Sequence, residues 1–159
     1  MMNNKSARTK DSAHVLNNIG LILYRQGKFD ETIDCHQRAL KIREKLYPFV
    51  HADMAKSLGN IGNILSDQRK YNEALDNHQH ALKIEEKFHP FGHVDIAHSL
   101  KNIDICYQHL NDRYMTLDYY RHALSIYEKF LPHEHPCRQK TEHNICRLTE
   151  EFCSRSMSQ

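Results

Sequence analysis

The strongest constraint on this chain is an internal repeat with a period of 42 residues. Residues 14–53 aligned with residues 56–95 are identical at 22 of 40 positions, and residues 56–95 aligned with residues 98–137 are identical at 15 of 40. Self-similarity at a fixed period is typical of a repeat array, in which each unit buries its apolar face by stacking on its neighbours. We therefore expect three full copies, the third divergent, and the beginning of a fourth.

The apolar residues in each copy recur at helical spacing. One apolar set stops at Gly27 and a second stops before Pro48, so each unit reads as a helix, a short turn and a helix. The predicted helices span residues 11–26, 30–46, 53–68, 72–88, 95–110, 114–130 and 136–152. Only 5 Gly and 4 Pro are present, too few turn signals for a sheet protein, so the pattern predicts an all-α chain.

Stacked helical hairpins of this kind form a right-handed superhelix, or α-solenoid, with one concave face. The units expected from the repeat register are a disordered N-terminus at 1–10, three repeats at 11–52, 53–94 and 95–135, a half-repeat or capping helix at 136–153 and a disordered tail at 154–159. The last helix has a narrow apolar stripe and charge elsewhere, as expected of a helix that covers the final hairpin and faces water.

Charge and motif content exclude several functions. The chain has 22 Lys and Arg against 20 Asp and Glu, far from the basic excess typical of nucleic-acid binding. It has no apolar run long enough to cross a membrane and no signal-peptide core near the start, and its five cysteines suit a reducing compartment. It also lacks a glycine-rich phosphate loop, HExxH and GxSxG. We expect a cytoplasmic protein with no enzymatic activity, no cofactor, and no nucleic-acid or membrane partner.

The retained positions resemble the tetratricopeptide repeat, or TPR, over residues 11–152. The pattern residues are Leu16, Ile19, Gly20, Leu23, Phe29, Thr32 and Ala39, with copies at Leu58, Ile61, Gly62, Leu65, Tyr71, Ala74 and Ala81. The 42-residue length and the runs ALKIREK at 39–45 and ALKIEEK at 81–87 are similar to the kinesin light chain subfamily. The resemblance implies a TPR superhelix and an adaptor for protein partners, with cargo binding and a link to the cytoskeleton as in kinesin light chains.

Four asparagines at one repeat position are the main candidate binding residues. In the fold that the resemblance implies, the first helix of each pair lines the concave groove, and an amide there can pair with the main chain of an extended ligand. Basic residues one turn away favour an acidic segment of a partner protein. The candidate groove residues are Asn18, Lys56, Asn60, Asn63, His98, Lys101, Asn102, Lys140 and Asn144. Alternatively, these side chains form only a solvated polar face.

Two further functions stay open. The chain could be a self-associating structural piece of a larger scaffold, with its incomplete fourth unit as an interface. The 13 histidines also raise metal binding, for which His135, Cys137, His143 and Cys146 are the candidate zinc ligands. Their spacing matches no strong zinc motif, and a histidine at the position of His135 follows from the repeat register, so we expect no metal.

Overall fold

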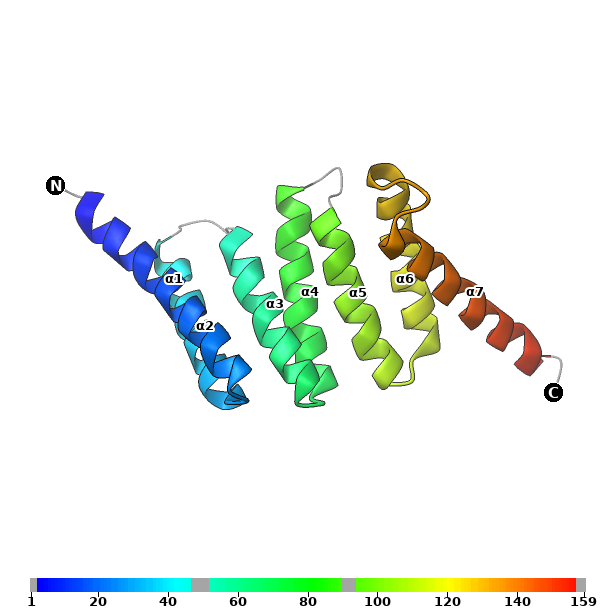
Figure 1. Ribbon diagram of the computed structural model, residues 1–159, viewed down its shortest axis with the longest axis horizontal. Helices are drawn as coiled ribbons and strands as arrows, with labels where there is room; N and C mark the ends of the chain where they lie inside the picture. Colours follow the sequence, from blue (N-terminus) through cyan, green and yellow to red (C-terminus); the bar gives the residue numbers. More distant parts are fainter. Residues whose placement is uncertain (1–2, 47–51, 90–93, 157–159) are drawn as a thin grey trace. The chain divides into compact units, whose positions relative to one another are not determined.

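The computed structural model describes residues 3–46, 52–89 and 94–156, and these form seven α-helices and no strand (Figure 1). The chain divides into two compact units, unit 1 at Met1–Phe88 and unit 2 at His89–Gln159. Unit 1 contains the hairpins α1 (Asn3–Arg25) with α2 (Phe29–Leu46) and α3 (Ala52–Asp67) with α4 (Tyr71–Phe88). Unit 2 contains the hairpin α5 (Val94–His109) with α6 (Arg113–Phe130), followed by α7 (Pro136–Ser156).

The bounds of α2 to α6 agree within one residue with the predicted helices. The outer ends differ. Helix α1 begins at Asn3, eight residues before the predicted start at 11 and inside the segment 1–10 that was assigned to the N-terminus. That stretch contains Ala, Lys and Arg, which propagate a helix well, and no Gly or Pro to stop one. Helix α7 likewise continues to Ser156, into the predicted tail. The remainder of that tail, 157–159, lies outside the described residues.

The three hairpin turns share one backbone conformation. Gly27, Arg69 and Asn111 occupy the same repeat position and have φ angles of 74°, 61° and 60°. In each turn the following residue donates its N–H to a carbonyl near the end of the first helix, as in Lys28 to Leu23 at 3.0 Å and Lys70 to Leu65 at 2.8 Å. These bonds satisfy helix-end carbonyls while the left-handed residue reverses the chain.

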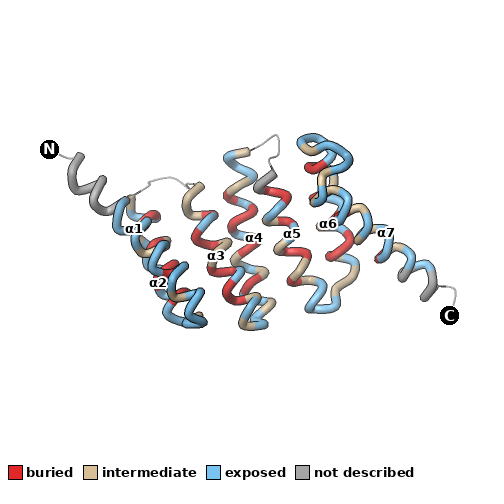
Figure 2. Tube along the Cα trace, in the orientation of Figure 1, coloured by how far each residue is buried: buried red, intermediate tan, exposed pale blue. Residues whose placement is uncertain are grey.

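The core of unit 1 lies between its two hairpins. Figure 2 shows buried segments along both α3 and α4. Ala55 and Leu58 of α3 pack with Ala81 and Ile84 of α4, and Leu40 of α2 packs against this cluster. Polar bonds also join the hairpins: the Tyr24 hydroxyl donates to Asp67 at 2.6 Å, and Gln68 Nε2 donates to Asp30 at 3.1 Å.

A buried cation helps to fix α2 in unit 1. Arg43 is 3% exposed and donates to Ser57 of α3. When the Asn17 amide donates to Nδ1 of His36, its oxygen accepts from the two terminal nitrogens of Arg43 at 3.0 and 3.1 Å. Buried charges are tolerated when they are hydrogen-bonded in this way.

Two glycines allow each hairpin of unit 1 to close on a histidine. A Cβ added at Gly62 would lie 2.6 Å from the His78 ring, and one at Gly20 would lie 3.0 Å from the His36 ring. Both histidines are almost fully buried. Burial lowers the pKa of His78 to about 4, and burial together with the nearby Arg43 lowers that of His36.

In unit 2, α7 packs on α6. Leu148 of α7 forms a buried cluster with Leu117 and Tyr120 of α6, and Ile145 packs against it. Helix α7 begins with Pro136 at its first turn, where the missing N–H has no helical partner to lose. The helix therefore closes the apolar side of the last hairpin, as a capping helix does.

Candidate functional site: two pockets beside the first helices

Unit 1 has a pocket of about 140 Å³ that is lined by α1 and α3, the first helices of its two hairpins, and by α2. The residues that line it are Leu21 and Tyr24 of α1, Thr32 and His36 of α2, and Asn60, Asn63 and Ile64 of α3. We call it the unit 1 pocket. Its wall combines apolar side chains with two amides, and its inner side carries the His36 ring.

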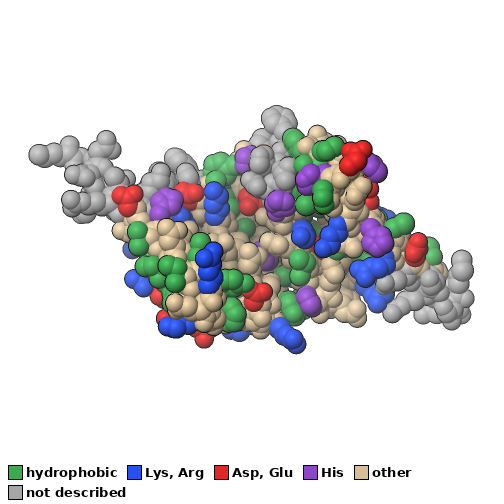
Figure 3. Space-filling model, in the orientation of Figure 1, with side chains coloured by type: hydrophobic (Ala, Val, Ile, Leu, Met, Phe, Trp, Pro, Cys, Tyr) green, Lys and Arg blue, Asp and Glu red, His purple; other side chains and the backbone are tan. Residues whose placement is uncertain are grey.

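Unit 2 has a larger pocket of about 370 Å³. It is lined by α5, α6 and α7, which take the places that α1, α2 and α3 have in the unit 1 pocket. Helix α5 contributes Lys101, Asp104, Ile105 and Gln108, helix α6 contributes Tyr120 and Tyr127, and helix α7 contributes Pro136, Cys137, Lys140, Thr141, Asn144 and Arg147. We call it the unit 2 pocket. Figure 3 shows Lys and Arg side chains along α5 and α7 on the face that it displays.

The two pockets are equivalent in the repeat register. Asn144 of the unit 2 pocket corresponds to Asn60 of the unit 1 pocket, and Tyr120 corresponds to His36. The repeat thus places an asparagine on one wall and a polar ring on the inner side in both units. Other equivalent positions differ: Arg147 stands where the unit 1 pocket has Asn63, which makes the unit 2 pocket more basic.

A hydrogen-bonded network lines the inner side of the unit 2 pocket. Gln108 Nε2 donates to Asp104 Oδ1 at 2.7 Å and to the Tyr120 hydroxyl at 2.8 Å, and Asn144 Nδ2 donates to the same hydroxyl at 2.8 Å. Burial raises the pKa of Asp104 to about 6. Burial, followed by the charge of Asp104, raises the pKa of Tyr120 to about 12. The amides thus hold the carboxyl and the phenol in fixed positions.

The pockets contain five of the nine predicted groove residues. Asn60 and Asn63 line the unit 1 pocket, and Lys101, Lys140 and Asn144 line the unit 2 pocket. The other four line neither: Asn18, Lys56 and His98 are exposed on α1, α3 and α5, and Asn102 is half-buried on α5. Asn18, Lys56, Asn60 and Asn63 belong to unit 1, and the remaining five belong to unit 2.

Sequence reasoning missed Asp104, Tyr120 and Tyr127 as site residues. Asp104 replaces the glycine of the first two copies, and Tyr120 replaces the histidine that packs against that glycine. These two substitutions occur together at positions in contact. This paired change is the signal in the sequence that points to these site residues.

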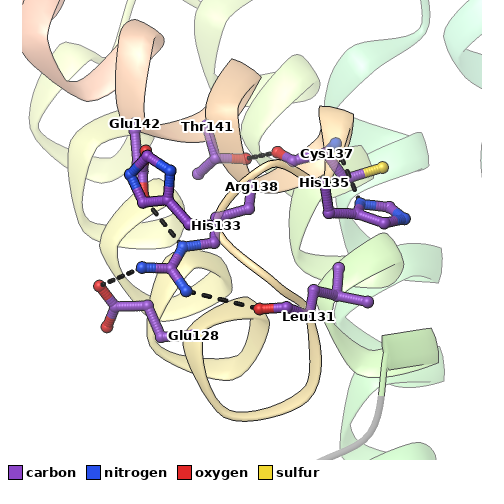
Figure 4. A network of polar contacts seen from close by, with 8 residues as sticks. All are labelled: Glu128, Leu131, His133, His135, Cys137, Arg138, Thr141 and Glu142. Atoms are coloured by element: carbon purple, nitrogen blue, oxygen red, sulfur yellow. Dashed lines mark hydrogen bonds and ion pairs between the residues drawn. The ribbon is translucent and has the colours of Figure 1, made fainter.

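The structure supplies no ligand set for the zinc alternative. Among residues with described side chains, no three His, Cys, Asp or Glu are grouped so that they could hold a metal. His135 Nδ1 accepts from the backbone N–H of Cys137 at 3.3 Å, and the nearby Arg138 pairs with Glu142 at 3.0 Å (Figure 4). His143 and Cys146 are exposed on α7. The four candidate ligands are therefore not brought together, and His135 caps the start of α7.

Comparison with known proteins identifies the family. The tetratricopeptide repeat model matches residues 11–87 and 53–129, and the chain belongs to this family. The fold is thus an all-α TPR solenoid, which is a scaffold for binding protein partners. Comparison with curated protein sequences gives no match. In the described part of the chain, no helix is both long and apolar enough to span a membrane.

Solved structures share this fold at low sequence identity. Kinesin light chain-type TPR-like repeats from Podosopora anserina align with a TM-score of 0.74 and 16% identity, covering 91% of this chain and 68% of theirs. BtubC (BKLC) from P. vanneervenii aligns with a TM-score of 0.77 and 17% identity, covering 87% of this chain and 55% of its own. The N-terminal domain of stress-induced protein-1 from C. elegans aligns with a TM-score of 0.69 and 16% identity, covering 89% of this chain and 97% of that domain.

Proposed function

We propose that the chain is a non-catalytic adaptor that binds an extended acidic segment of a partner protein along its first helices. The observation that carries the proposal is the equivalence of the two pockets, each with an asparagine at the same repeat position. An asparagine amide can pair with the main chain of an extended peptide whatever the peptide's sequence, and each unit has such an amide in its own pocket. Lys101, Lys140 and Arg147 supply the charge that favours acidic ligands at the unit 2 pocket.

Charge reversal at the unit 2 pocket tests this proposal. We expect Lys140→Glu with Arg147→Glu to weaken binding of a fluorescent peptide of Asp and Glu at least tenfold, since both changes turn attraction into repulsion. Binding by the unaltered protein should weaken as salt rises, because exposed charges are screened.

The control is Arg121→Glu with Lys129→Glu, which changes two exposed cations of α6 that do not line the pocket. Equal loss in both double variants would contradict the proposal, as would the absence of peptide binding.

The similarity in fold to kinesin light chain-type repeats supports a narrower version of the proposal, in which the partner is cargo in the cytoplasm and the adaptor serves the cytoskeleton. This version predicts that the protein captured by the chain carries an acidic segment that competes with the Asp and Glu peptide. Capture that the peptide cannot displace would contradict it.

Self-association is the second candidate function, and the outer face of α1 favours it. Val15, Ile19 and Ile22 are 54%, 41% and 57% exposed on one side of this helix. The equivalent α3 residues Ile61 and Ile64 are buried. An apolar stripe that is covered in one repeat and exposed in another is typical of a surface that meets a partner.

A further inference from the structure

Two polar atoms of the unit 2 pocket are buried without a hydrogen-bond partner. They are Oδ2 of Asp104 and the hydroxyl oxygen of Tyr127, and each residue is only 1% exposed. Both residues line the same pocket of about 370 Å³, one from α5 and the other from α6. A buried polar group without a partner costs stability. An atom of this kind beside a cavity therefore indicates a place where a ligand group can supply the missing bond.

The two atoms differ in what they require. The pKa of Asp104 is about 6, so near neutral pH its side chain is a carboxylate: Oδ1 already accepts from Gln108, and Oδ2 can accept from a further donor. Burial raises the pKa of Tyr127 to about 12, so its hydroxyl keeps a proton that it can donate to an acceptor. A ligand group that satisfies both must therefore combine an N–H or O–H donor with an oxygen acceptor.

We propose that the unit 2 pocket takes the carboxamide side chain of a glutamine or asparagine that lies within an acidic segment of the partner. The amide NH₂ donates to Asp104 and the amide oxygen accepts from Tyr127, while Ile105 and Pro136 pack against the aliphatic part of the side chain. This inference rests on the proposed binding of an acidic segment and adds to it the residue that enters the pocket.

The charges at the rim agree with this choice. Three cations line the pocket and are exposed: Lys101, Lys140 and Arg147. Acidic residues on either side of the inserted glutamine can therefore pair with these cations. An acidic side chain inside the pocket would instead meet the carboxylate of Asp104, and like charges at short range repel. The pocket thus favours a neutral amide within an acidic sequence.

A pair of matched peptides tests the inference with the full chain. Both are short, acetylated and amidated, with acidic residues flanking a central glutamine in one and a leucine of similar size in the other. Titration calorimetry should show the glutamine peptide binding about tenfold more tightly, because leucine leaves both buried polar atoms without partners. This comparison requires no protein variant.

Tyr127→Phe then tests the assignment of the hydroxyl. We expect this variant to lose most of the preference for glutamine while still binding the leucine peptide normally. The control is Tyr119→Phe, which makes the same change on the same helix at a residue that does not line the pocket. Removal of an unpaired buried hydroxyl should not lower the thermal unfolding midpoint, whereas loss of a structural hydrogen bond would.

The outcomes separate the two proposals. Equal affinity of the unaltered protein for both peptides would overturn the carboxamide inference and leave the acidic-segment function standing. Binding of neither peptide would overturn both. A glutamine preference that survives Tyr127→Phe, or a Tyr127→Phe variant that is clearly destabilised, would overturn the role given to this hydroxyl.

Discussion

At the scale of single residues, the buried side chains of His78 and Asp104 make the stability of the fold depend on pH in opposite directions. The pKa of His78 falls from 6.5 to about 4 in the folded chain, so the unfolded state binds more protons between these values. Unit 1 therefore loses stability as the pH drops through this range, by on the order of 3 kcal/mol. The pKa of Asp104 rises from 3.8 to about 6, so the folded state binds more protons there, and unit 2 loses stability as the pH rises.

We expect Asp104→Asn to stabilise the protein at pH 7.5, because it removes a buried charge while keeping the size of the side chain. The gain should be on the order of 2 kcal/mol and should fall to less than half at pH 4.5, where Asp104 is protonated in the fold but still largely ionised in the unfolded chain. Urea unfolding followed by NMR signals of unit 2 at the two pH values measures this difference. A gain that is the same at both pH values would show that the charge of Asp104 is not its cause.

At the scale of elements, the hairpin turns predict a stabilising substitution. Arg69 has a φ of 61°, in the region where an L side chain crowds the backbone, and its equivalent in the first hairpin is Gly27. Arg69→Gly should raise the free energy of unfolding by about 0.5–1 kcal/mol. The substitution relieves the backbone strain at this position, and this gain exceeds the loss from the greater conformational freedom of glycine in the unfolded chain. Denaturant unfolding measures the difference in free energy. Asn111→Gly is the matched comparison and should gain less, because asparagine tolerates this conformation. A destabilised Arg69→Gly would contradict the argument.

The repeat also explains which elements could be predicted from sequence. Each of the helices from α2 to α6 has a copy at fixed spacing, so turn residues such as Gly27 and the apolar positions fix their bounds. Helix α1 before Asp11 has no such copy, and only its favourable composition extends it to Asn3. The amides of Asn60 and Asn144 could be predicted as candidate site residues because asparagine recurs at this position of the repeat. Asp104 could not be predicted in this way, because it replaces the glycine that the first two copies have at its position.

At the scale of the whole molecule, the exposed face of α1 predicts an assembly that depends on concentration. If the self-association candidate is correct, light scattering should show a mass that rises with protein concentration, and Ile19→Asp with Ile22→Asp should keep the chain monomeric. Both residues are exposed on α1, over which Figure 3 shows hydrophobic side chains at the surface. Leu110→Asp, at an exposed apolar residue outside α1, is the control. A monomer at every concentration would exclude this function for the chain alone.

The coupled exchange of Gly62 and His78 for Asp104 and Tyr120 has a wider consequence. In the third copy this pair lies on the inner side of the unit 2 pocket, while the hairpin that carries it, α5 with α6, keeps the bounds of α3 with α4 in the repeat register. Ligand preference can therefore diversify one repeat at a time, by compensated double substitutions that leave the scaffold intact. An array built in this way can acquire a different binding specificity in each repeat through very few changes.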